Sequence, residues 1–356
     1  MSAITSRAES FCSRFGLRVP ILLAPMAGAC PPSLSIAVAS AGGLGACGVL
    51  LMKPDEITAW ANDVRTSSNG AFQLNVWIPD PAPRRDAEHE GRVRAFLGQW
   101  GPLVPPEAAD AALPDFAAQC EAMLAAGPRI ISSIMGLYPP AFVARLKARN
   151  IAWFANVTTV AEARAAEAAG ADVIVAQGAE AGGHRGAFNA ADAERRLVGL
   201  FALLPAVVDA VRVPVVATGG IADARGIAAA LTLGASAVQI GTGFLRCPEA
   251  KLHPAWADAL ARTAPEDTVV SRVFSGRSGR AVATDYTRAA TADSAPPPAP
   301  YPIQRALTAA MRAQGQKDGD LHRMQAWAGQ SAALAKAEPA AALVQRLWDE
   351  ARTIIA

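Results

Sequence analysis

The sequence has few aromatic residues and almost no net charge. Phe, Trp and Tyr together make up 6% of the 356 residues, and 33 Lys and Arg against 31 Asp and Glu leave a formal charge of +2. A charge this balanced provides no strong attraction for nucleic acid or for an acidic membrane surface. Hydrophobic residues, at 52%, are too abundant for a disordered chain. We therefore expect a folded protein whose core is mainly Ala, Val, Leu and Ile, as in helices packed on a buried parallel sheet.

Cysteine is also scarce. The five cysteines are odd in number and include no C-x-x-C pair, which argues against a disulfide framework and favours a reducing, cytoplasmic location. Residues 19–52 carry no charge, but Pro20, Pro25, Pro31 and Pro32 would interrupt a membrane-spanning helix. The charged N-terminal residues do not resemble a signal peptide. We predict a soluble protein without membrane association, present as a monomer or a homodimer.

Several common catalytic motifs are absent. The sequence has no H-x-x-x-H or Cys/His cluster for a metal, no G-x-x-x-x-G-K for phosphates and no G-x-S-x-G nucleophile turn. Gly43–Gly48 matches the G-x-G-x-x-G spacing of a dinucleotide site, but a helix-like segment precedes it and an apolar run follows it. A dinucleotide site needs the opposite order. We interpret these glycines as a helix-to-strand turn, and we expect no metal and no nucleic-acid partner.

Eight short apolar runs alternate with Ala-rich, helix-like segments between residues 20 and 247. The predicted strands are Ile21–Ala24, Leu44–Cys47, Phe72–Val76, Ile130–Ile134, Ile151–Asn156, Val173–Ala176, Pro214–Ala217 and Ala237–Ile240. Eight such units with mostly short connections predict an α/β fold, a (β/α)8 TIM barrel, rather than an open doubly wound sheet. Residues 79–114 form an excursion after the third strand. Residues 248–356, with helices predicted at Ile303–Arg312 and Ala340–Ile355, form a mostly helical C-terminal region over the barrel mouth, which leaves residues 1–247 as the barrel domain.

Two neighbouring predicted strands end in glycine. Gly219 and Gly220 follow the seventh strand, and Gly241 follows the eighth. On a barrel these strand ends commonly form a phosphate site, because glycines let backbone N–H groups approach the phosphate oxygens closely. Glycines are also ordinary turn formers, but two such ends in adjacent positions favour phosphate binding.

His184 lies in a glycine-rich loop, Gln177–Gly186, directly after the sixth predicted strand. An imidazole with an unperturbed pKa of ~6.5 suits acid/base chemistry near neutral pH. Lone histidines are usually structural or solvated, and we assign His89, His253 and His322 to that group because each lies in a charged or helical stretch. The position of His184 at the carboxyl end of a strand instead indicates a catalytic residue.

With these features the sequence resembles the nitronate monooxygenase family, formerly called 2-nitropropane dioxygenases. The matching segments extend over nearly the whole chain and are Pro20–Gly28, Gln73–Trp77, Gly178–Gly186, Ala217–Asp223, Gln239–Thr242 and Trp327–Gln330. The Gly-Gly-His loop is shared with FMN-dependent enoyl reductases of the same fold, whereas the Trp-Ala-Gly-Gln segment and the long C-terminal region favour the monooxygenases. The resemblance implies a barrel that binds FMN non-covalently at its mouth.

The resemblance also implies a role for each matching residue. The first strand would line the flavin, two amides would hydrogen-bond its ring or ribityl chain, the glycine-rich strand ends would hold its phosphate, and the C-terminal region would reach in. In chain order these residues are Ala24, Pro25, Met26, Asn75, Gln177, Gly182, Gly219, Gly220, Gln239, Ile240, Gly241, Thr242, Trp327 and Gln330. Each has a structural alternative: Met26 could fill the core, Asn75 could cap a strand end, and Gln239 could pair with backbone.

Enzymes of this family oxidise an alkyl nitronate, such as propionate 3-nitronate, with O₂ to a carbonyl compound and nitrite. By resemblance, His184 would lie beside the nitro group, as a hydrogen-bond donor to the anion or as a base for a neutral nitroalkane. The sequence departs from the family pattern, since it has no tyrosine between Phe96 and Phe116. Arg305 also follows Tyr301, where many members have a second tyrosine and a lysine.

Tyr301 and Arg305 are therefore candidates for contact with the distal end of the substrate.

Two other functions remain open at this point. One is an FMN-dependent NAD(P)H reductase of enoyl thioesters or quinones, and the other is a barrel that binds flavin or phosphate without catalysis.

Overall fold

A ring of eight parallel strands forms the centre of the protein. In the computed structural model, which describes residues 3–356, these strands are β1 (Ile21–Leu23), β2 (Gly45–Gly48), β3 (Phe72–Trp77), β4 (Ile130–Ile134), β5 (Ala152–Val157), β6 (Val173–Gln177), β8 (Val215–Thr218) and β9 (Ala237–Ile240). They pair in the order β1-β9-β8-β6-β5-β4-β3-β2, and a parallel bridge between Leu22 and Leu44 joins the two ends. The predicted (β/α)8 barrel is confirmed, and strands buried on both faces explain the continuous apolar runs.

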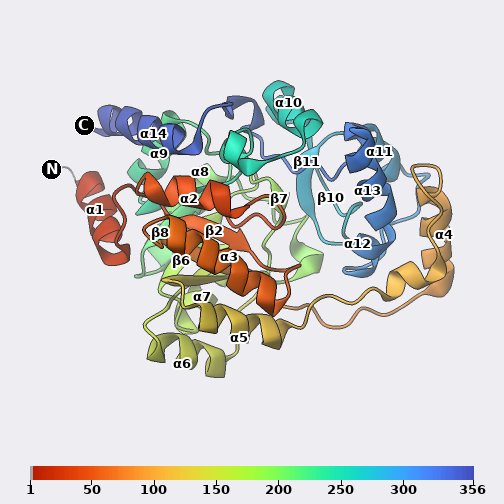
Figure 1. Cartoon of the computed structure of the whole chain (residues 1–356), viewed down its shortest axis with the longest axis horizontal. Coiled ribbons are helices and arrows are strands. Elements are labelled where there is room, and N and C mark those ends of the chain that lie inside the picture. Colours follow the sequence, from red (N-terminus) through yellow and green to blue (C-terminus); the bar gives the residue numbers. More distant parts are fainter. Residues whose placement is uncertain (1–2) are drawn as a thin grey trace.

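Helices surround this ring (Figure 1). They are α2 (Pro32–Ser40), α3 (Pro54–Ser67), α5 (Phe116–Ala126), α6 (Pro140–Ala148), α7 (Val160–Ala168), α8 (Leu200–Ala210), α9 (Ala224–Thr232) and α14 (Ala340–Ile355). In α14 the buried residues Leu343, Leu347 and Ala351 recur every four positions and so form one apolar face. This helix packs against α9 and α2, on the outside of the barrel. Within residues 3–356, no helix is both long enough and apolar enough to cross a membrane.

The glycine-rich segment between α2 and β2 is a helix-to-strand turn, as the order of its flanking elements predicts. Helix α2 ends at Ser40, and β2 begins at Gly45. A Cβ atom at Gly43 would lie 2.5 Å from the backbone oxygen of Ile21, so no larger residue fits there. The glycines thus serve close packing of the turn on the first strand.

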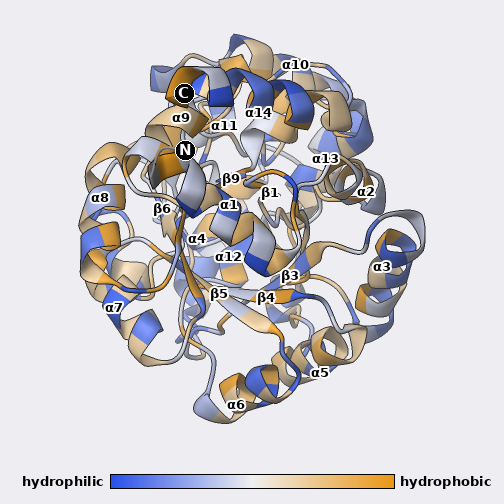
Figure 2. Ribbon diagram, turned by 90° about the vertical axis from the view of Figure 1, so that its left-hand side faces the viewer, coloured by the Kyte–Doolittle hydropathy of each residue, from blue (hydrophilic) through white to orange (hydrophobic). Residues whose placement is uncertain are grey.

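The N-terminal helix α1 (Ala3–Phe15) covers the amino ends of the strands (Figure 2). The Phe15 ring lies 5.1 Å from the ring of Phe154, which points into the barrel from β5, and Phe11 lies 6.2 Å from the same ring. These aromatic rings belong to a buried cluster with residues at the start of several strands. The opposite end, where the strands finish, is therefore the open mouth.

The excursion after β3 and the C-terminal region pack on each other beside this mouth (Figure 1). The excursion contains α4 (Ala87–Leu97), and the C-terminal region contains α10 (Pro254–Arg262), α11 (Asp285–Ala290), α12 (Ile303–Leu307) and α13 (Ala309–Asp318). Val93 and Leu97 of α4 are buried in one cluster with Phe274, Leu307 and Met311. The single helix predicted over residues 303–312 is divided into α12 and α13.

A small antiparallel sheet connects the His184 loop to the C-terminal region. Its strands are β7 (Gly183–His184), β10 (Thr268–Ser271) and β11 (Gly279–Val282), in the order β10-β11-β7. His184 lies opposite Gly279 in this sheet. The sequence analysis did not predict these strands, because they lie outside the alternation of apolar runs and helix-like segments that identified the equally short barrel strands.

Candidate active site

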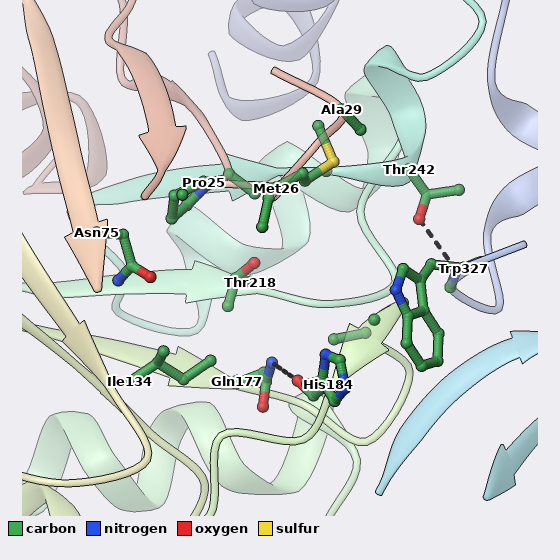
Figure 3. Close-up of a pocket in the computed structure, with 18 of the residues that line it drawn as sticks. Pro25, Met26, Ala29, Asn75, Ile134, Gln177, His184, Thr218, Thr242 and Trp327 are labelled. Atoms are coloured by element: carbon green, nitrogen blue, oxygen red, sulfur yellow. Dashed lines mark hydrogen bonds between the residues drawn. The ribbon is translucent and has the colours of Figure 1, made fainter. Parts of the chain in front are cut away.

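The carboxyl ends of the barrel strands surround a cavity of about 380 Å³ (Figure 3). Most of the residues predicted to form the site line it, and they come from segments about 300 positions apart in the sequence. They are Ala24, Pro25, Met26, Asn75, Gln177, Gly182, His184, Gly219, Gly220, Gln239, Gly241, Thr242, Arg305 and Trp327. The barrel and the C-terminal region therefore contribute to one site. Within residues 3–356, no group of three His, Cys, Asp or Glu side chains lies close enough to hold a metal ion.

Three predicted residues lie outside the cavity wall. The side chain of Ile240 packs in the main hydrophobic core, and the Gln330 side chain donates to the backbone oxygen of Pro265 at 3.5 Å. The Tyr301 ring packs on Trp77, with 5.2 Å between centroids, and its buried hydroxyl has no hydrogen-bond partner. Tyr301 lines an adjoining cavity of about 390 Å³, which shares only Leu50 and Trp77 with the first.

Glycines allow three loops to meet on one side of the cavity. A Cβ atom at Gly182 would lie 2.4 Å from the backbone nitrogen of Gly329, and that nitrogen donates to Thr242 Oγ1 at 3.0 Å. Gly219 and Gly220, directly after β8, have φ values of +109° and +69°, which residues with a Cβ rarely adopt. The loops after β6, β8 and β9 therefore approach each other, and the segment after residue 326, closely at positions where a Cβ atom has no room.

The amide side chains of Asn75, Gln177 and Gln239, which line the cavity, are held by specific hydrogen bonds. Gln177 donates to the backbone oxygen of His184 at 3.1 Å and accepts from the Gly186 N–H at 2.8 Å, so its amide holds the histidine loop. Gln239 accepts from Gln73 at 3.0 Å. Asn75 donates to Ser132 at 3.0 Å, which leaves its Oδ1 as an acceptor on the cavity wall.

His184 lies between two tryptophans, Trp77 and Trp327, on the cavity wall, and Figure 3 shows its ring beside that of Trp327. Its ring centroid is 4.5 Å from that of Trp77 and 4.7 Å from that of Trp327, both in edge-on contact. Burial lowers the pKa of His184 to about 3, and the positive charges of Arg277, Arg305 and Arg312 act in the same direction. The imidazole is therefore neutral at physiological pH.

The neighbouring arginines differ in how their charge is balanced. Arg277 is 1% exposed and forms a two-bond ion pair with Asp80, in which Nε donates at 2.8 Å. Arg312 donates only to neutral acceptors, the Thr308 hydroxyl among them, and burial lowers its pKa to about 10. Within residues 3–356, the Arg305 side chain has neither a carboxylate nor a hydrogen-bond partner, and it lines the cavity. The site thus presents positive charge that an anionic ligand can balance.

Sequence reasoning missed several residues around His184, namely Trp77 as a site residue, Ser275, Arg277 and Arg312. The segment Ser275–Arg280 carried a signal, because it concentrates glycine, serine and arginine outside the barrel alternation. Its contacts with the histidine loop depend on the pairing of β7 with β11, which no local pattern predicts.

Comparison with known proteins identifies relatives along the whole chain. A sequence model described as nitronate monooxygenase matches residues 10–350. A nitronate monooxygenase of Paraburkholderia phytofirmans is 39% identical over 350 residues, covering 96% of this chain and 94% of that protein. Among solved structures, nitroalkane oxidase from Streptomyces ansochromogenes superimposes with a TM-score of 0.86 at 33% identity, covering 96% of this chain and 98% of that one. FabK from Thermotoga maritima has a TM-score of 0.76 at 27% identity, covering 97% and 96%.

Proposed function

The chain belongs to the nitronate monooxygenase family and is an oxidoreductase, and from this premise we propose that it uses FMN and O₂ to oxidise alkyl nitronates, such as propionate 3-nitronate, to a carbonyl compound and nitrite. The observation that carries the proposal is the joint presence of a neutral His184 and an unpaired Arg305 on one cavity wall. A nitronate is an anion, and such a wall offers it positive charge without a competing carboxylate.

The residues at the mouth fit FMN. The glycine-rich ends of β8 and β9 line the cavity, and glycine lets backbone N–H groups approach a single phosphate closely. Gly219, Gly220, Gly241 and Thr242 would hold this phosphate. Asn75, with its acceptor oxygen on the wall, would bind the ring beside residues 24–26. When bound, FMN supplies the electron acceptor that nitronate oxidation requires.

The protein residues orient the substrate and control its charge. Arg305 would bind a carboxylate at the distal end of the substrate, because its planar guanidinium matches the geometry of a carboxylate. This sequence has Arg305 after Tyr301, where by resemblance many family members have a second tyrosine and a lysine. Arg312, which also lines the cavity and donates to the backbone oxygen of Arg305 at 2.9 Å, adds a second positive charge. Trp77 and Trp327, in edge-on contact with the His184 ring, shield part of it from water. His184 would then either donate to the nitronate or accept a proton from a neutral nitroalkane.

Anaerobic mixing tests this function. The purified protein is expected to show a flavin absorption band that bleaches with propionate 3-nitronate and not with NADH or NADPH. The Gly43–Gly48 turn has the wrong element order for a second nucleotide. Bleaching by NADH or NADPH alone would replace the proposal with the reductase alternative, and bleaching by none of the three would favour a binding barrel.

The cytoplasmic location and the monomeric or homodimeric state stay predictions. The five cysteines are free and buried, which agrees with the absence of a disulfide framework. Size-exclusion chromatography with light scattering measures the oligomeric state directly.

A further inference from the structure

Ser275 holds one of the two ring nitrogens of His184. Its Oγ lies 2.8 Å from Nε2 of the histidine, and the serine is 1% exposed. The other nitrogen, Nδ1, has no hydrogen-bond partner among residues 3–356, and it is not fully buried. Because His184 lines the cavity, Nδ1 is the nitrogen open to a ligand.

The hydrogen bonds of Ser275 decide which nitrogen carries the proton. A serine hydroxyl has one proton to donate and can accept two. Ser275 Oγ lies 3.0 Å from the backbone oxygen of Arg277, to which it can only donate, and 3.3 Å from the Arg277 N–H, from which it can only accept. All three contacts are satisfied together only if Nε2–H of His184 donates to Ser275. The opposite tautomer would leave the Arg277 oxygen without this donor.

We infer that Ser275 is a positioning residue that keeps His184 in its Nε2–H tautomer, so that Nδ1 accepts a proton from a neutral nitroalkane bound in the cavity. This inference rests on the proposed function and decides between the two roles left open for His184 there. It extends the substrates from preformed nitronates to nitroalkanes.

The proton transfer balances without another reactant. The C–H bond beside the nitro group breaks, its electron pair forms the C=N double bond of the nitronate, and the negative charge moves to the nitro oxygens. The proton forms a bond with Nδ1. Burial and the positive charges of Arg277, Arg305 and Arg312 all oppose protonation of His184, but the same positive charges stabilise the nitronate beside it. When the proton moves from the nitroalkane to His184, the arginines disfavour the imidazolium and favour the nitronate. These two contributions oppose each other, so the arginines do not prevent the proton transfer.

Nuclear magnetic resonance of ¹⁵N-histidine-labelled protein tests the tautomer without any assay of activity. The chain has four histidines, and the His184→Asn variant identifies the signals of this ring. We expect a protonated Nε2 and an unprotonated Nδ1 in the wild type. In Ser275→Ala the ratio should shift toward Nδ1–H by about tenfold or more, because a buried N–H without an acceptor is disfavoured.

Ser278→Ala is the matched control. Ser278 lies in the same segment, is 2% exposed, and donates to Glu194 at 2.7 Å rather than to His184. Its replacement should leave the His184 tautomer unchanged. A wild-type ring protonated on Nδ1, or an unchanged tautomer in Ser275→Ala, would overturn the inference.

Kinetics test the consequence. In Ser275→Ala the ratio of kcat/KM for neutral nitroethane to that for ethylnitronate should fall by about tenfold or more, whereas the Ser278→Ala variant should keep the wild-type ratio. Equal losses on both substrates, or a wild type that oxidises ethylnitronate and never nitroethane, would refute the base role. If neither compound is oxidised, the proposed function fails. The tautomer of His184 is still determined by the nuclear magnetic resonance measurement.

Discussion

Replacement of His184 by Asn should remove part of the acid sensitivity of the fold. Burial, with further contributions from Arg277, Arg305 and Arg312, lowers the pKa of His184 to about 3 in the folded protein, whereas the pKa of an unfolded histidine is ~6.5. Between these two values the unfolded chain binds a proton at this position and the folded chain does not. The free energy of unfolding therefore falls as the pH falls below 6.5.

The size of this effect at pH 5 depends little on the folded pKa, because pH 5 lies well above it. The interval from pH 6.5 to pH 5, at ~1.36 kcal/mol per unit, corresponds to a loss of about 2 kcal/mol. At pH 7 the contribution is close to zero. His184→Asn lacks the titrating group, so its stability should decrease by about 2 kcal/mol less than that of the wild type between pH 7 and pH 5.

Urea unfolding at the two pH values, followed by tryptophan fluorescence, measures this difference. Comparison within each protein cancels any change in stability that the substitution causes at neutral pH. The same replacement at exposed His322 serves as control for loss of a histidine as such. An identical pH dependence in the wild type and in His184→Asn would refute the reasoning, since the folded pKa would then be near its ordinary value.

Four further predictions concern the bound flavin, His184, Arg305 and the ion pair of Arg277. The flavin released by heat should be FMN rather than FAD, as chromatography of the supernatant shows, because the site offers one phosphate cradle. His184→Asn should lower turnover with nitronate by ~10²–10⁴ while FMN affinity, measured by fluorescence titration, stays within a few-fold; wild-type turnover would make the residue structural. Arg305→Met should raise KM for propionate 3-nitronate and leave that for ethylnitronate nearly unchanged, so equal effects would exclude a carboxylate contact. Asp80→Ala should lower the free energy of unfolding by about 3 kcal/mol, because Arg277 stays buried without its carboxylate; denaturant unfolding with no change would contradict this.

The barrel could be predicted from sequence because its strands are buried on both faces. Continuous apolar runs such as residues 173–176 then coincide with most of a strand, here β6. The alternation of side chains along a strand also explains one failure. Gln239 and Ile240 are adjacent in β9, so if one side chain faces the barrel interior the other faces the helices.

Contacts between distant segments could not be predicted in this way. Ser275 reaches His184 across 91 positions, through a sheet whose strands have at most four residues. The break between α12 and α13 falls at Thr308, whose hydroxyl donates to the backbone oxygen of Phe274 at 2.7 Å. The secondary-structure propensity of a segment predicts neither contact, because both depend on how the C-terminal region folds and packs on the barrel.

Helix α14 has a consequence for the order in which the protein can be assembled. It fills the gap between α9 and α2 on the barrel wall, although residues 241–339 separate it from β9. During synthesis on the ribosome, that gap stays open until residues 241–339, and then α14 itself, have left the exit tunnel. The apolar faces of α2 and α9 are exposed throughout that interval, and the barrel wall is completed only when the segment carrying the active-site arginines is already present.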